Sequence, residues 1–356
     1  MVHFIYRVPP SSNKWMRKLE HWQWKVIRKL RRPIPTTWRR GGHFAQQDSL
    51  RAPLSITVNL YDYLSRRTKA YLYDLFEPGV IPYLPNDIIL GHPWMDENTI
   101  TRQTFLNPAP CRLKALIFPI HHAIPEINYY ARPVVEKADI VFGIMGPYWY
   151  DTLDYSEFAD WKPKLVRLDM AIDSKAFPFV KTQFNPPGKR GYLYIGRNSP
   201  EKGADILSQT MAGLVDYPRG WIGGGDEIAN MKRLAIFTQL TPDYVRSLAA
   251  QYDFFVNTSV SDANPTTILE AMAWGFPVAC TPQSGYYRMP TVIELSTTDI
   301  GSNTQKLREL QYQPEEKLAE ISTQNREMVD KTYTWDRFCT TVWRHIEPYL
   351  SASIRR

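Results

Sequence analysis

One stretch of the chain, residues 253–281, constrains the fold more than any other; its sequence is DFFVNTSVSDANPTTILEAMAWGFPVACT. Short apolar runs at both ends, residues 253–256 and 276–280, are typical of strands buried on both faces. Between them lie a polar loop and an expected helix, residues 266–274, for which Gly275 is the expected C-terminal cap. Strand, helix and strand in this order predict a parallel sheet with helical connections.

The start of this helix is suited to an anion. Asn264 is expected to cap the helix, and Pro265 to be its first residue. Unpaired backbone N–H groups and the helix dipole favour a phosphate there, and Thr266 and Thr267 add hydroxyl donors. A well-capped helix that binds nothing fits the same residues.

Two carboxylates flank the helix start. Glu270 lies one turn into the helix, on the face of Thr266 and Thr267. Because a carboxylate repels phosphate but accepts hydrogen bonds from a diol, Glu270 is a candidate for binding a ribose. Asp262 precedes the helix, and seven residues separate it from Glu270.

An acidic residue, seven residues and a glutamate, followed by Ala-Met-Ala-Trp-Gly-Phe-Pro-Val, resembles the E-x7-E signature of retaining glycosyltransferases of family 4. Aspartate, Asp262, stands where the family has its first glutamate. The resemblance implies the GT-B fold, an α/β architecture of two Rossmann-like domains facing across a cleft, with a C-terminal helix crossing back to the first domain. It also implies that Asp262 binds the transferred sugar and Glu270 the nucleotide ribose.

A glycine turn with two basic residues follows another expected strand, residues 191–195. It contains Gly196, Arg197 and Lys202. Arginine can bind a diphosphate through two parallel hydrogen bonds, and lysine supplies a point charge. A solvated turn is the alternative. The turn resembles the family's G-R-x(n)-K-G segment, which implies that Arg197 and Lys202 hold the donor diphosphate.

Three expected strands in the first half end in histidine or in glycine and aromatic residues: 87–90, 112–120 and 139–143. Because ligands of open parallel sheets gather at the carboxyl ends of strands, these ends predict one wall of a cleft. The family resemblance implies that a histidine here lies near the reacting sugar, and His121 matches that position better than its neighbour. His92 and His122 are candidates on the acceptor side. A structural histidine is the alternative in each case.

The N-terminal part departs from this pattern. An expected strand, residues 3–8, precedes a basic amphipathic segment, residues 14–40, which combines tryptophans with lysines and arginines. Such a segment is typical of a helix on an anionic membrane surface, although a basic acceptor site or a solvated helix also fits. Gly42 corresponds by resemblance to a loop near the donor diphosphate, and a plain turn is the alternative.

Length and charge agree with two domains. The chain has 356 residues and a net charge of +7, which fits an anionic partner such as a nucleotide, an acidic lipid or a glycan. The expected divisions are an acceptor-side domain at 1–185, a nucleotide-sugar-binding domain at 186–332 and the crossing helix at 333–356. Three scattered cysteines, and no apolar run that could span a bilayer or act as a signal peptide, favour the cytoplasm.

The hypothesis from the sequence is a retaining glycosyltransferase of hexosyltransferase type, active in polysaccharide biosynthesis. It would move a sugar from a UDP- or GDP-linked donor to a glycan, lipid-linked or other hydroxyl acceptor, on the cytoplasmic face of a membrane. No cofactor, no metal and no nucleic-acid partner are expected, since neither an Asp-x-Asp motif nor a nucleic-acid-binding module occurs. The alternative is a non-catalytic glycan- or lipid-binding protein on a degenerate GT-B scaffold.

Overall fold

The computed structural model describes residues 1–8, 25, 29, 52–96, 98–236 and 240–351. The basic segment 14–40, apart from Lys25 and Lys29, and the candidate Gly42 lie outside the described residues, so their roles stay predictions. In the part that is described, no helix is both long enough and apolar enough to cross a bilayer.

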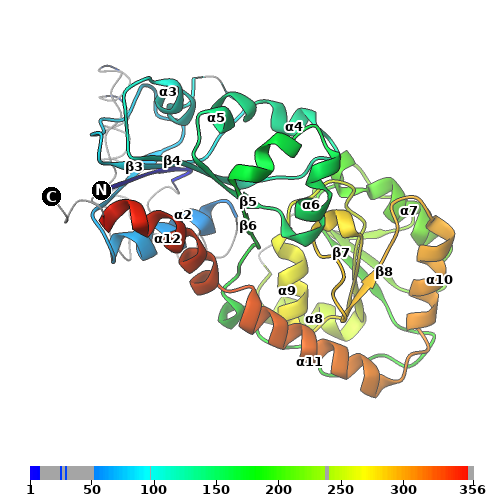
Figure 1. Ribbon diagram of the computed structural model, residues 1–356. Coiled ribbons are helices and arrows are strands. Elements are labelled where there is room, and N and C mark those ends of the chain that lie inside the picture. The colour runs from blue at the N-terminus through cyan, green and yellow to red at the C-terminus, as the bar shows by residue number, and fades with distance from the viewer. Residues whose placement is uncertain (9–24, 26–28, 30–51, 97, 237–239, 352–356) are drawn as a thin grey trace.

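The first half of the chain forms a six-stranded parallel sheet with the order β2-β1-β3-β4-β5-β6 (Figure 1). Its strands are β1 (Val2–Tyr6), β2 (Ala70–Asp74), β3 (Ile88–Gly91), β4 (Leu113–Pro119), β5 (Ile140–Ile144) and β6 (Leu165–Leu168). Helices on its two faces are α2 (Leu54–Ser65), α3 (Ile100–Leu106), α4 (Glu126–Tyr129), α5 (Arg132–Glu136) and α6 (Gly146–Thr152). Phe4 and Tyr6 enter the core on one face and Ile5 the core on the other. Burial on both faces explains why these strands are continuous apolar runs.

The second half forms another six-stranded parallel sheet, with the order β12-β11-β10-β7-β8-β9. Its strands are β7 (Tyr192–Ile195), β8 (Arg219–Ile222), β9 (Lys232–Ala235), β10 (Phe254–Asn257), β11 (Val278–Cys280) and β12 (Val292–Glu294). Its helices are α7 (Ala204–Ala212), α8 (Pro242–Gln251), α9 (Thr266–Trp274), α10 (Ile300–Leu310) and α11 (Glu315–Thr332). The expected helix 266–274 is confirmed as α9, and Gly275 caps it in the left-handed conformation with φ 93°.

The last helix, α12 (Trp335–Ser351), returns to the first sheet and packs against α2 (Figure 1). Tyr63 of α2 and Thr340 of α12 share a hydrogen bond of 2.9 Å between their hydroxyls. Arg112, which precedes β4, donates to the backbone carbonyl of Tyr349 at 2.9 Å. The predicted architecture of two parallel sheets and a helix that crosses back is therefore confirmed.

Candidate active site

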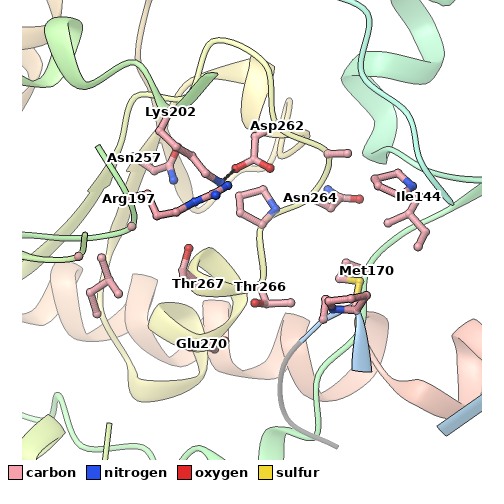
Figure 2. Close-up of a pocket in the computed structure, with 18 of the residues that line it drawn as sticks. Ile144, Met170, Arg197, Lys202, Asn257, Asp262, Asn264, Thr266, Thr267 and Glu270 are labelled. Carbon is pink, nitrogen blue, oxygen red and sulfur yellow. Dashed lines mark hydrogen bonds and ion pairs between the residues drawn. The ribbon is translucent and has the colours of Figure 1, made fainter. Parts of the chain in front are cut away.

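A cavity of about 620 Å³ lies between the two sheets (Figure 2). Residues at the carboxyl ends of strands line it from both sides, including Tyr6 of β1 and Ile144 of β5 in the first sheet. Ile195 of β7 and Asn257 of β10 are their counterparts in the second sheet. This is where parallel α/β sheets bind ligands, because loops and helix starts converge at that edge.

Most of the candidate residues from the sequence meet in this cavity. Those that line it are Gly196, Arg197, Lys202, Asp262, Asn264, Thr266, Thr267, Glu270 and His92. His121 and His122 do not belong to the described lining. The predicted cleft wall is thus formed at the ends of β3, β4 and β5, through His92, Pro119 and Ile144, without the two histidines that follow β4.

The basic turn after β7 and the loop before α9 meet through a charge pair. Lys202 Nζ forms an ion pair with the Asp262 carboxylate, drawn as the dashed line in Figure 2. Arg197 is 65% exposed and lies 3.3 Å from Glu201 Oε1. A diphosphate in this cavity would therefore compete with two carboxylates for these cations, both of which belong to lining residues.

Asn264 does not cap α9, which corrects the expectation from the sequence. Its backbone is in the left-handed region with φ 53°, and the helix begins at Thr266 with Pro265 at the cap position. In Figure 2 the Asn264 side chain lies on the side of Ile144, away from the first turn of the helix. The side chain is 2% exposed, and neither amide atom has a hydrogen-bond partner in the described part of the chain. Asparagine tolerates this backbone conformation, which turns its side chain away from the capping geometry.

Glu270 is buried on α9, below Thr266 and Thr267 in Figure 2. The expected placement, one turn into the helix and on the same face as the threonines, is what the structure shows. The hydroxyl groups at the helix start and the carboxylate below them form a wall that suits a phosphate above a ribose.

His121 reaches the loop that carries Asp262. Its Nδ1 is 2.7 Å from Ser261 Oγ, and Trp149, whose ring lies beside it, donates from Nε1 to the Asp262 carbonyl at 2.8 Å. Burial lowers the pKa of His121, although the nearby Asp262 carboxylate favours the protonated ring. His122 Nε2 lies 2.9 Å from Thr152 Oγ1 on α6. It is therefore His121 that hydrogen-bonds to the loop of the candidate site.

His92 is held as a neutral ring. Its Nδ1 lies 2.9 Å from the Ile117 carbonyl, which can only accept, so Nδ1 carries the hydrogen. Burial lowers the pKa of His92 to about 4. The ring lies against Tyr6 and Trp94, with centroid separations of 4.6 and 6.0 Å.

The second sheet matches a known family. Residues 189–302 match the family model described as glycosyl transferases group 1. This segment is a glycosyltransferase group 1 domain. A putative teichuronic acid biosynthesis glycosyltransferase, TuaC of Bacillus subtilis, is 34% identical over 28% of this chain and 26% of its own length. Sulfoquinovosyl transferase SQD2 of Arabidopsis thaliana is 28% identical over 49% of this chain and 36% of its own length. The chain thus matches about a quarter to a third of these relatives.

Solved structures extend the likeness from the group 1 domain to both sheets. An α,α-trehalose 6-phosphate synthase from Burkholderia multivorans superposes with a TM-score of 0.60 at 9% identity. The superposition covers 100% of this chain and 98% of that one. The predicted GT-B fold, with two Rossmann-like sheets, is therefore confirmed.

Within this fold the group 1 domain contributes the charged part of the cavity, and the first sheet contributes an aromatic part. Sequence reasoning missed Tyr6 and Trp94 as lining residues. The cluster Gly-His-Pro-Trp, which begins at the last residue of β3, is a signal for Trp94. Tyr6 had none, because it stands inside an apolar run that is otherwise core.

Proposed function

We propose that the chain is a retaining glycosyltransferase of the family 4 type, with Asp262 and Glu270 as its acidic pair. The donor would be a UDP- or GDP-linked sugar, and the acceptor a hydroxyl group of a glycan or a lipid-linked molecule. The observation that supports this most is the convergence of Arg197, Lys202 and the start of α9 on one cavity between the sheets. Cations and unpaired N–H groups at one place suit a diphosphate.

In the proposed reaction, the bond between the sugar C1 and the diphosphate oxygen breaks and a bond from the acceptor oxygen to C1 forms on the same face. The acceptor proton passes to the leaving phosphate oxygen. Arg197 and Lys202 stabilise the negative charge that grows on the leaving group. Asp262 would bind hydroxyls of the transferred sugar, and Glu270 the ribose. His121 would lie near the reacting sugar through the loop it contacts.

The test is a thermal-shift panel of UDP, GDP, ADP and TDP with their common sugars, with and without EDTA. We expect one diphosphate series to raise the melting temperature without any effect of EDTA, and Glu270→Gln to lose that shift. Slow hydrolysis of the matching sugar donor would then separate an enzyme from a binding protein. If none of the nucleotides raises the melting temperature, the proposed donor site is contradicted. Activity that is lost in EDTA and restored by manganese would contradict metal independence.

Location is a separate part of the proposal. The basic amphipathic segment 14–40 would hold a cytoplasmic protein against an anionic membrane surface. Deleting these residues should release the protein from anionic liposomes in a sedimentation assay. Equal sedimentation of the full chain and the deletion variant would contradict this role.

A further inference from the structure

The wall of the cavity formed by the first sheet carries two unused polar groups. Tyr6 is a lining residue of the cavity, and its buried hydroxyl has no hydrogen-bond partner in the described part of the chain. A buried hydroxyl without a partner loses its bonds to water, so a ligand that replaces them is favoured. His92, another lining residue, uses Nδ1–H on the Ile117 carbonyl, which leaves its Nε2 as an acceptor. One donor and one acceptor, on rings 4.6 Å apart, complement a single ligand hydroxyl.

Beyond these groups the wall becomes apolar and continues to the surface. Trp94 lies between the His92 ring and Phe76, and the Phe76 ring meets it edge-on at 5.7 Å. Phe76 is 43% exposed and Met95 is 67% exposed. Phe76 follows β2, Tyr6 ends β1 and Trp94 follows β3, so neighbouring strands bring these residues to one edge of the sheet.

The remaining side chains of this wall are also poor in polar groups. Ile56, Ile144 and Met170 line it, and Arg7 is the one charged side chain that the described part of the first domain adds. A free sugar acceptor needs several hydrogen-bonding partners around its ring, and the described residues of this wall offer few. An acceptor with one hydroxyl near the reaction and a hydrocarbon body gains free energy from the remaining surface.

We propose that this wall is the acceptor subsite and that it takes an amphiphile. The acceptor hydroxyl lies between Tyr6 and His92, and the hydrocarbon part leaves the cavity over Trp94, Phe76 and Met95. The proposal rests on the proposed glycosyl transfer and names the class of its acceptor.

The test compares two probes that differ only in their tail, methyl β-D-glucoside and octyl β-D-glucoside, the latter below its micelle concentration. Calorimetric titration of the full chain, saturated with its nucleoside diphosphate, gives the ratio of the two dissociation constants. We expect octyl glucoside to bind at least about tenfold more tightly, since burying only part of the tail suffices for that difference. Trp94→Ala and Phe76→Ala should each lower the ratio, because they remove the surface under the tail.

Control variants separate this site from binding of the tail elsewhere. Tyr155, which is 92% exposed and outside the described cavity lining, serves as the matched aromatic control, and Tyr155→Ala should keep the ratio. His92→Phe should weaken both probes by the same factor and keep the ratio, because it removes the hydroxyl partner and not the tail surface. If that variant does not fold, Tyr6→Phe removes the other partner with one atom changed.

Two results would overturn the proposal. Equal affinity for the two glucosides would show that the aromatic wall is a platform for a plain sugar. A ratio that Trp94→Ala and Phe76→Ala leave unchanged would place the tail elsewhere on the protein. The nucleotide panel tests the proposed function independently, so a thermal shift by nucleotide without tail discrimination would refute the acceptor subsite alone.

Discussion

Lys202 and Asp262 neutralise each other at the place where a diphosphate would bind. We predict that Asp262→Asn tightens binding of the free nucleoside diphosphate about fivefold, or about 1 kcal/mol, because a partly exposed ion pair no longer competes for Lys202. Transfer should nevertheless fall, because the sugar loses a carboxylate acceptor. Calorimetric titration measures the affinity. The control is Asp243→Asn, which removes an exposed ion pair outside the described lining. Weaker binding of the diphosphate in Asp262→Asn would refute this competition.

Arg197 and Lys202 should matter more in the transition state than in donor binding. We predict that Arg197→Ala and Lys202→Ala each lower kcat/KM by an amount equivalent to about 2–4 kcal/mol, since charge on the leaving diphosphate grows as the bond breaks. Steady-state transfer assays measure the effect. Lys137→Ala removes an exposed lysine outside the described lining and should leave kcat/KM unchanged. Full activity in either cavity variant would mean that other groups bind the diphosphate.

Because His92 is buried as a neutral ring, the free energy of unfolding is expected to decrease as the pH falls. Between pH 6.5 and about 4, the unfolded chain protonates this histidine while the folded chain does not. Because the unfolded state then binds more protons, stability is lost as the pH falls through this window. We predict that His92 accounts for a loss of roughly 3 kcal/mol in the free energy of unfolding between pH 7 and pH 4. Urea unfolding of wild type and His92→Gln measures it, and parallel pH curves for the two proteins would contradict the assignment.

At the scale of elements, the two loops that form the charged wall depend on each other through Gly203. Gly203 has φ 63°, and a Cβ there would lie 2.0 Å from the Thr258 carbonyl oxygen. Thr258 Oγ1 in turn donates to the Gly203 carbonyl at 2.9 Å. The turn before α7 and the loop before α9 are therefore packed backbone against backbone, which fixes the distance between Lys202 and Asp262.

We predict that Gly203→Ala destabilises the protein by about 2–4 kcal/mol, because the added methyl group meets backbone that cannot move aside. Nucleotide affinity should fall with it, as the loops separate. Gly301 on α10 is the matched control, since a Cβ there meets no atom closer than 3.6 Å. Gly301→Ala should raise stability by up to about 1 kcal/mol. Thermal and urea unfolding measure the stability of both variants. Equal stability of Gly203→Ala and Gly301→Ala would contradict the tight backbone packing of the two loops.

How deeply a strand is buried explains whether it could be predicted from the sequence. Central strands such as β4 and β10 are buried on both faces and therefore stand out as apolar runs. The edge strands β9 and β12 contain lysine, arginine or glutamate and carry no such run, and they were not predicted. The prediction for Asn264 is wrong because an asparagine before a proline and a helix fits an N-cap as well as it fits a turn in the left-handed conformation. Only the packing of the loop decides between the two.

At the scale of the whole molecule, the part of the site within the second domain could be predicted in the most detail. Arg197, Lys202 and Glu270 lie on segments that follow strands of a single sheet, so chain order and motif spacing place them together. In the first domain, strand ends and His92 are candidates from the sequence, but how this wall faces the second sheet is encoded by no local pattern. Tyr6 and His92 therefore became recognisable as neighbours of the charged wall only in the folded chain.

The connection between the sheets is made by α11, which packs on α9, and by α12, which packs on α2 (Figure 1). Val342 and Ile346 of α12 are fully buried, so this helix is part of the core of the first domain although it is last in sequence. We predict that Val342→Asp destabilises the first domain by at least about 3 kcal/mol, because it places a charge in that core.

Differential scanning calorimetry with and without nucleotide distinguishes the two domains in this variant. We expect Val342→Asp to melt in two steps, an early one that nucleotide does not shift and a later one that it does, since the proposed donor site lies mainly in the second domain. Arg344→Asp, an exposed change on the same helix, should keep the wild-type profile. If Val342→Asp instead melts in one lowered transition that nucleotide shifts as a whole, the two sheets unfold as a single cooperative unit, and α12 stabilises the cavity as much as it stabilises the first domain.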